Sequence, residues 1–181
     1  MISDKELIEC CLENDRKAQK LLYDKFSSRM LGVCLRYSRN IQEAEDMMSE
    51  GFVNIFTKLS SFKADGPFEG WMRKIMVNTS ISQYRINLKH QYHQDVTEVN
   101  EISDNSENAL EKIEARDLMK VIQQMPEGYK VIFNLCIVEG YTHKDVSEIT
   151  GLSEGTSKSQ LSKAKKWLKN KLEEIEEKVI I

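Results

Sequence analysis

Apolar residues recur every three or four positions along most of the chain, the spacing that places them on one face of an α-helix. A first helix is predicted from Asp4 to about Asn14, because Ser3 and Glu6 have the types and spacing of a capping box. A second helix begins at Arg16, and its predicted inner face carries Ala18, Leu21, Leu22, Phe26, Met30 and Cys34. No alternation long enough for a β-strand occurs, so the pattern predicts an all-α protein.

Two more helices complete the first half of the chain. The stretch SFKADGP separates them, since Gly66 and Pro67 interrupt the periodicity and Pro67 is well placed to begin a helix. The predicted inner faces are Ala44, Met47, Met48, Ile55, Phe56 and Leu59 in the third helix, and Phe68, Trp71, Met72, Ile75 and Met76 in the fourth.

The character of the chain changes after residue 90. Residues 91–108 are rich in acids and have almost no apolar periodicity, which predicts a flexible acidic linker. Helical periodicity resumes at Ala109, and Pro126 separates that helix from another one carrying Tyr129, Ile132, Phe133, Leu135 and Cys136. We therefore predict two small helical domains, 1–90 and 109–181, joined by this linker.

The last part of the chain has the pattern of a helix-turn-helix. Thr142 and Asp145 form a second capping box, and Gly151 can take the left-handed conformation that ends a helix near Thr150. Ser153 can cap the next helix, which is predicted to run through Leu168. The apolar contacts expected between the two helices are Val146, Ile149, Leu152, Leu161, Ala164 and Leu168.

Charge makes the second of these helices unusual. The chain has a formal net charge of -3, yet no acid lies between Thr156 and Leu172, a stretch that holds six lysines. The predicted outer face combines short hydroxyls and lysines, which suit phosphates and base edges in a major groove: Ser159, Ser162, Lys163 and Lys166. A solvated lysine-rich helix is the alternative, but the capping box, the turn glycine and the absence of acids together favour DNA binding.

The residues give no indication of catalysis, a metal or a cofactor. Four cysteines occur without C-x-x-C spacing, which predicts reduced thiols and no zinc site: Cys10, Cys11, Cys34 and Cys136. His90 and His93 have H-x-x-H spacing, but no further ligand completes a site. The sequence has no secretory signal and no apolar run of about 20 residues that would insert into a membrane, so we expect a cytoplasmic protein.

Two stretches carry a resemblance to a known family. EAEDMMSEGFVNIFTKLSSFKADGPFEGWMRKIMVNTSISQYR resembles the second conserved domain of bacterial sigma factors of the extracytoplasmic-function group, within the sigma-70 superfamily. GYTHKDVSEITGLSEGTSKSQLSKAKKWL is similar to the fourth domain of the same family. The resemblance implies an alternative sigma factor, not an enzyme, which binds core RNA polymerase, directs it to promoters and promotes strand opening.

The resemblance also implies a role for each part. Domain 1–90 would bind the bacterial RNA polymerase core and recognise and melt the minus-ten element, and domain 109–181 would read the minus-thirty-five element. Promoter DNA is thus the second partner, and an anti-sigma factor is a third candidate, since such factors commonly hold family members inactive.

The resemblance implies these roles for individual residues at matching positions. It implies that Asp46, Glu50 and Phe52 bind the polymerase core. The minus-ten residues are Phe62, Lys63, Arg73, Lys74, Asn78 and Arg85, with Phe62 and Asn78 at the positions that capture an unpaired base. The minus-thirty-five residues are Lys158, Ser159, Ser162, Lys163 and Lys166. Ser157 replaces a usual small apolar residue, which we interpret as a matter of packing.

Three other classes of protein compete with this interpretation. A DNA-binding regulator with a sensory first half should show a ligand pocket or an acceptor Asp in an α/β pattern, and neither is apparent. An enzyme needs a partnered nucleophile, and Cys10 and Cys11 have no readable partner. A helical adaptor leaves the basic helix unexplained.

Overall fold

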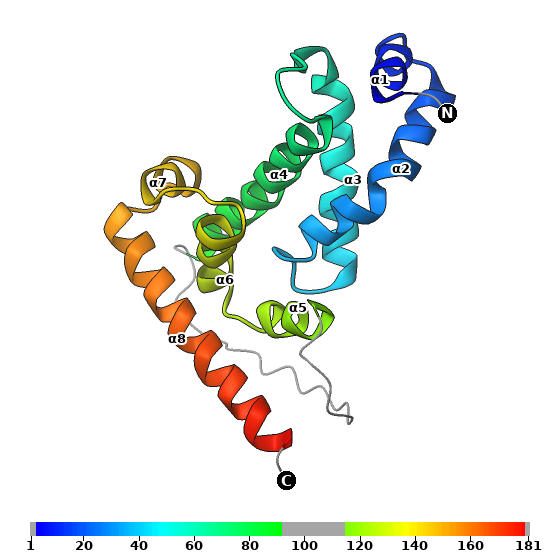
Figure 1. Ribbon diagram of the computed structural model, residues 1–181. Coiled ribbons are helices and arrows are strands. Elements are labelled where there is room, and N and C mark those ends of the chain that lie inside the picture. The colour runs from blue at the N-terminus through cyan, green and yellow to red at the C-terminus, as the bar shows by residue number, and fades with distance from the viewer. Residues whose placement is uncertain (1–2, 92–114, 180–181) are drawn as a thin grey trace. The chain divides into compact units, whose positions relative to one another are not determined.

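The structure, a computed structural model, describes residues 3–91 and 115–179, and every regular element in these ranges is helical, as predicted (Figure 1). The chain divides into two compact units, Met1–Gln83 and Tyr84–Ile181. Apart from Gln91, the predicted linker lies outside the described residues, as does the start of the helix predicted from Ala109.

The first unit is built from a set of capped helices. They are α1 (Asp4–Leu12), α2 (Arg16–Cys34), α3 (Ile41–Lys58), the short 3-10 helix η1 (Leu59–Ser61) and the first part of α4 (Phe68–Gln91). The predicted capping box of Ser3 and Glu6 is confirmed. Asp15 and Asn40 cap α2 and α3 with their side-chain oxygens. These caps satisfy backbone N–H groups that the helices leave unpaired at their first turns.

The core of this unit lies where α2, α3 and α4 face one another. On α2, Ala18, Leu22, Phe26, Met30 and Cys34 are buried as predicted, whereas Leu21 is 52% exposed and its assignment to the inner face is wrong. Successive residues of an α-helix lie 100° apart, so a stripe built on steps of four from Ala18 excludes Leu21. α3 and α4 contribute Ala44, Met47, Met48, Phe52, Ile55, Met72, Met76, Val77 and Ile81.

At Gly51, helix α3 has no room for a side chain beside α4. A Cβ atom at this position would lie 2.2 Å from the Sδ atom of Met76, whose side chain is fully buried. One turn further along α3, the amide of Asn54 donates a hydrogen bond of 3.1 Å to the hydroxyl of Thr79 on α4. A side chain at position 51 would therefore require the buried Met76 side chain to move within a close-packed core.

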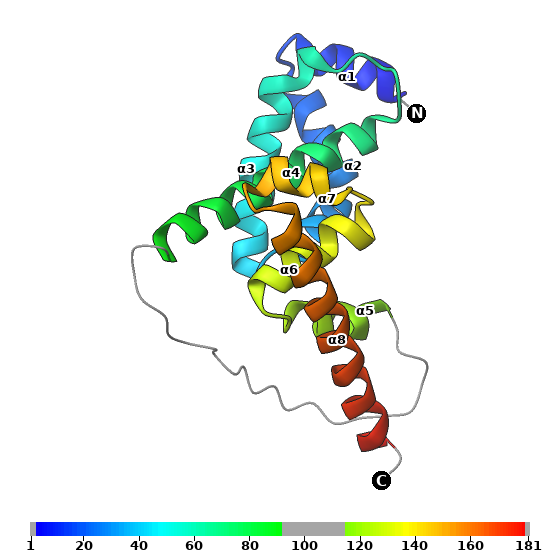
Figure 2. The same ribbon diagram turned by 90° about the vertical axis from the view of Figure 1, so that its left-hand side faces the viewer.

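The second unit contains the predicted helix-turn-helix. Its elements are α5 (Ala115–Gln123), α6 (Glu127–Phe133), a π-helical turn η2 (Asn134–Val138), α7 (His143–Thr150) and α8 (Glu154–Val179). Ile122, Met125, Phe133 and Ala164 form a buried cluster, so α8 packs one face against this unit (Figure 2). The sequence does not predict the π-helical turn, because the apolar periodicity of its residues is that of an ordinary α-helix.

The turn between α7 and α8 forms as its residues predict. Gly151 has φ of 79°, in the left-handed region, and its N–H bonds the carbonyl of Ser147. The hydroxyl of Ser153 accepts a 3.0 Å hydrogen bond from the N–H of Thr156 in the first turn of α8. Helix α8 continues past the predicted end at Leu168 as far as Val179.

The close approach at Gly51 gives a first prediction. We expect Gly51→Ala to lower the free energy of unfolding of the first unit by about 1–2 kcal/mol, because displacing the buried Met76 outweighs the higher helix propensity of alanine. The measurement is denaturant unfolding in a Trp167→Phe background, where the remaining tryptophan, Trp71, reports on this unit.

Gly32→Ala is the matched control. Gly32 also lies inside a helix, but an added Cβ would meet no atom within 4 Å. We expect this substitution to stabilise the unit by about 0.5–1 kcal/mol. Equal stability of the two alanine variants would contradict the close-packing role of Gly51.

The capping box of α7 gives a prediction about pH. The hydrogen bond from the Thr142 hydroxyl, at 2.6 Å, and a second from its N–H, at 2.9 Å, lower the pKa of the Asp145 carboxyl below its ordinary value of 3.8. A lowered folded-state pKa contributes stability that is present above pH 3.8 and is lost as the pH falls through the folded value. We therefore expect the stability difference between the wild type and Asp145→Asn to shrink below pH 3.8.

Thermal unfolding in a Trp71→Phe background, followed by the fluorescence of Trp167, checks this expectation. Glu148→Gln, an exposed carboxylate on the same helix, serves as the control. A stability difference for Asp145→Asn that persists unchanged down to pH 2 would rule out this role of the carboxylate.

Candidate polymerase and nucleic-acid interfaces

The outer face of α8 presents all five residues predicted to contact the minus-thirty-five element. Lys158, Ser159, Ser162, Lys163 and Lys166 are all exposed. Ser157 and Ala164 are fully buried on the opposite side of the same helix, while Leu161 and Leu168 are half-buried there. The ammonium of Lys158 lies 3.9 Å from the carboxylate of Glu154, a long and exposed ion pair that contributes little. This face is therefore positively charged and open to solvent.

The inner side of α8 holds a contact that the sequence did not reveal. The hydroxyl of Ser157 lies 2.8 Å from Nδ1 of His143, at hydrogen-bonding distance. Burial of Ser157 agrees with its interpretation as a packing residue, but packing does not account for this polar bond. Because 14 positions separate the two residues, no local pattern in the sequence could have indicated it.

Helix α3 presents two of the three residues predicted to bind the polymerase core. Asp46 and Glu50 are exposed, but Phe52 is only 3% exposed. The ring of Phe52 packs between Tyr23 of α2, at a centroid distance of 4.6 Å, and Phe56, at 6.2 Å. Phe52 thus belongs to the core of the unit, and its assignment to a contact surface is corrected. One turn beyond Glu50, Val53 is 64% exposed and was not singled out from the sequence.

The loop between η1 and α4 places an aromatic group beside exposed positive charge. Phe62 is half-buried, with its ring centroid 5.1 Å from that of Phe68 and 5.5 Å from that of Trp71. Trp71 stacks on Phe68 at 5.7 Å with an interplanar angle of 19°. Lys63, next to Phe62, is exposed. The ring of Phe62 is therefore held by two neighbours while part of it stays accessible.

Along α4, the predicted polar residues do not all share one face. Lys74 and Asn78, four residues apart, are exposed on the same side of the helix, and Arg85 farther along α4 is exposed as well. Arg73 is half-buried and lies about 100° around the helix from Lys74. The hydroxyl of Ser82 donates to the backbone carbonyl of Asn78 at 2.9 Å, so Ser82 is turned toward its own helix.

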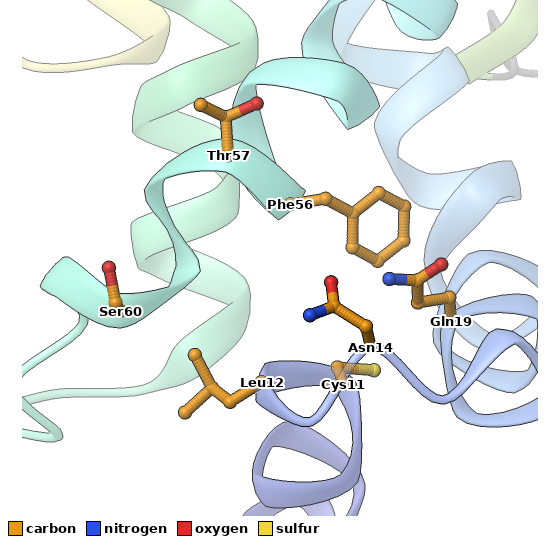
Figure 3. A pocket seen from close by; sticks show the side chains of 7 residues that line it. All are labelled: Cys11, Leu12, Asn14, Gln19, Phe56, Thr57 and Ser60. Carbon is orange, nitrogen blue, oxygen red and sulfur yellow. The ribbon is translucent and has the colours of Figure 1, made fainter.

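A groove in the first unit lies among α1, α2 and the end of α3 (Figure 3). Its one titratable side chain is that of Cys11, and burial raises the pKa of this thiol. Burial also raises the pKa of Cys34, to about 11. The lining residues are Cys11, Leu12, Asn14, Gln19, Phe56, Thr57 and Ser60.

Within residues 3–91 and 115–179, no three side chains of His, Cys, Asp or Glu are grouped so that they could hold a metal ion. None of the helices described there combines the length and the apolar character needed to cross a bilayer. His93, one of the two histidines in the H-x-x-H spacing, lies outside the described residues.

Comparison with protein families gives two separate matches. The family model described as Sigma-70 region 2 matches residues 22–87, and the one described as Sigma-70, region 4 matches residues 115–168. The first match contains α3, the loop with Phe62 and most of α4, and the second contains α7, the turn and the first part of α8. Together the two models match most of the chain in the order that the sequence predicts.

Curated relatives match over nearly their whole length. The RNA polymerase sigma-H factor of Pseudomonas aeruginosa is 26% identical over 181 residues, covering 94% of this chain and 94% of the relative. The ECF RNA polymerase sigma-E factor of Haemophilus influenzae is 24% identical over 184 residues, covering 95% of this chain and 96% of the relative.

A solved structure shares the fold. The sigma factor RpoE of Bartonella quintana, determined in complex with the anti-sigma factor NepR, aligns with a TM-score of 0.53 and 19% identity, covering 85% of this chain and 96% of that one. The two matched regions, their order along the chain and the relatives that match over nearly their whole length all indicate the same family. The chain therefore belongs to the sigma-70 family as an extracytoplasmic-function sigma factor, a non-enzymatic, DNA-binding subunit with which RNA polymerase initiates transcription.

Proposed function

We propose that the two parts of the chain divide promoter recognition between them. Domain 1–90 binds the polymerase core and holds the melted minus-ten element, domain 109–181 reads the minus-thirty-five element, and residues 91–108 connect them. The observation that carries this proposal is the exposed, lysine-rich face of α8 between Thr156 and Leu172, a stretch without acids on a chain whose net charge is -3. Positive charge concentrated on one helix of an acidic chain favours local docking on phosphate over general adhesion to DNA.

The outer face of α8 has the chemistry of a major-groove reader. Lys158, Ser159, Ser162 and Lys163 provide donors and small hydroxyls that reach base edges, and Lys166 contacts a phosphate. The opposite face of α8 is anchored in the unit's own core cluster. A helix fixed in this way can enter a groove without losing its packing.

The loop and α4 have the chemistry for holding an unpaired base. The accessible part of the Phe62 ring offers a stacking surface, and the exposed amide of Asn78 offers a donor and an acceptor for a base edge. Lys63, Lys74 and Arg85 attract the backbone of the single strand, and Arg73, which is half-buried, lies at the margin of this surface.

The exposed carboxylates of α3 bind the RNA polymerase core in this proposal. Asp46 and Glu50 lie four residues apart, so both can meet basic side chains of one partner helix. Val53, which follows one turn later, adds an exposed apolar contact to this acidic surface. Phe52 is not part of the proposed surface, because its ring is buried.

We also infer regulation by an anti-sigma factor in the cytoplasm, where RNA polymerase is found. The similar sigma factor of Bartonella quintana was solved with such a partner, which supports this proposal by analogy only.

The division of labour predicts that variants in the two parts fail at different steps. In a complex with bacterial core polymerase, we expect Lys166→Ala to weaken promoter binding about threefold to tenfold. The slope of log affinity against log salt concentration should fall by about one, the change expected when one phosphate contact is lost. Asn78→Ala should leave initial binding nearly unchanged but reduce strand opening about tenfold, because the captured base loses its hydrogen bonds. Filter binding at several salt concentrations and permanganate footprinting separate the two steps.

Lys169→Ala is the control, because this lysine lies one turn beyond Lys166, outside the five residues proposed to contact DNA, and its ammonium is 3.6 Å from the carboxylate of Glu173. Its promoter binding and its strand opening should equal those of the wild type. If Asn78→Ala and Lys166→Ala instead impair both steps equally, the proposed division between the two parts is wrong.

The carboxylates of α3 give a separate prediction. We expect Asp46→Asn to weaken binding to the isolated core enzyme about fivefold to tenfold, since a charge-assisted contact is lost, and to leave the thermal stability unchanged. Fluorescence anisotropy of labelled chain titrated with core enzyme measures this affinity. The control is Asp24→Asn, an exposed carboxylate on α2 that pairs with Lys20 of its own helix; equal affinities for the two variants would exclude Asp46 from the interface.

A further inference from the structure

A hydrogen bond joins the beginnings of the two helices of the helix-turn-helix. His143 is the first residue of α7, and its Nδ1 atom lies 2.8 Å from the hydroxyl of Ser157 in the first turn of α8. Ser157 is fully buried and His143 is half-buried. The bond therefore closes the turn that contains Gly151 and lies in the interface between the helices, with α7 packed against the start of α8 (Figure 1).

A third polar group lies beside the same ring. The Sγ atom of Cys136, on the π-helical turn η2, is 3.9 Å from Nδ1 of His143. Burial raises the pKa of Cys136, although a hydrogen bond with Ser157 and the charge of Lys165 act in the opposite direction. The thiol thus stays protonated near neutral pH, and it remains a weak hydrogen-bonding group next to the pair of His143 and Ser157.

Apolar burial alone fixes the orientation of a helix less tightly than a directional bond does. The burial of Val146 on α7, which is fully buried, favours close packing but sets no particular angle. A buried hydroxyl, by contrast, loses stability when its partner moves out of hydrogen-bonding range. The bond between His143 and Ser157 therefore restricts rotation of α8 about its own axis.

Such a rotation would displace the residues that face DNA. Lys158 and Ser159 directly follow Ser157, and Ser162 and Lys163 lie on the next turn. With a helix radius of about 5–6 Å including side chains, a rotation of about 20° moves the outer atoms by about 2 Å. A shift of this size exceeds the narrow distance range of a hydrogen bond to a base edge.

We propose that His143 is a positioning residue for promoter recognition: through Ser157 it fixes the orientation of the outer face of α8, and so it narrows the set of sequences that this face accepts. The inference rests on the proposed role of α8 at the minus-thirty-five element. It goes beyond that role because neither His143 nor Ser157 is exposed on the proposed DNA-binding face.

The test uses the full chain bound to core polymerase and measures its affinity for two DNA fragments. One is a promoter fragment, and the other is the same fragment with a scrambled minus-thirty-five element. The affinity for the first divided by the affinity for the second is the specificity ratio. We expect Ser157→Ala and His143→Phe to lower this specificity ratio about threefold to tenfold, with an unchanged salt dependence because the phosphate contacts remain. His143→Asn, whose amide atoms are bonded to Cγ as Nδ1 is and can still bond the Ser157 hydroxyl, should restore most of the ratio.

Val146→Ala separates positioning from stability. This substitution removes buried methyl groups next to the bond and lowers the melting temperature, but it leaves His143 and Ser157 in place. At a temperature where all variants are folded, we expect its specificity ratio to equal that of the wild type. A ratio lowered as much as in Ser157→Ala would show that general destabilisation is responsible and would overturn the positioning role.

A measurement without DNA tests the bond itself. In the free chain, we expect Ser157→Ala to shift the 15N resonance of Nδ1 in His143, while Ser159→Ala leaves it unchanged; an unshifted resonance would overturn the proposal. A wild-type holoenzyme that binds both fragments equally would overturn the proposed role of α8 and this inference with it. If the wild type discriminates between the fragments and Ser157→Ala discriminates equally well, only the positioning role is overturned.

Discussion

The burial of one face of α3, α4 and α8 places the proposed functional side chains of these helices on the opposite, exposed face. In α8, Ala164 is fully buried while Ser162 and Lys163, its neighbours along the chain, are exposed. In α3, Phe52 and Ile55 are in the core and Asp46 and Glu50 are in solvent. Because successive residues differ by 100°, the packing that stabilises each helix also decides which side chains can meet DNA or polymerase.

This constraint explains why Gly51 matters for function as well as for stability. The side chain of Met76 on α4 fills the space beside Gly51 on α3, so a larger residue at position 51 would displace Met76 or the helix that carries it. One of them carries the carboxylates proposed for the core enzyme, and the other carries Asn78. An altered distance between the helices would therefore disturb both proposed surfaces at once, although neither Gly51 nor Met76 touches a partner.

Local signals made much of the fold predictable. The capping boxes at Ser3 and Thr142 and the left-handed glycine at 151 depend on residues within a few positions of one another, so their types and spacing were sufficient. The π-helical turn at Asn134–Val138 was missed because its residues follow the same apolar periodicity as an ordinary helix. The burial of Phe52 follows helical spacing as well, because Phe52 lies four residues after Met48 and three before Ile55, both on the predicted inner face of the same helix. The bond between His143 and Ser157, by contrast, could not be predicted, since only the folded turn brings these residues together.

Strand opening by such a protein has to be a linked equilibrium, because no catalytic group takes part. Extruding a base from the stack requires a few kcal/mol, and stacking on one aromatic side chain returns about 1–3 kcal/mol. The proposed contacts of Phe62 and Asn78 are therefore insufficient to melt a promoter by themselves. In the proposed arrangement, binding to the polymerase core through α3 and to the duplex through α8 would hold the loop at the melting site. Capture of the base would then no longer include the cost of bringing the molecules together. The orientation of α8 then affects strand opening as well as DNA binding. A helix anchored on the duplex determines where along the DNA the loop acts.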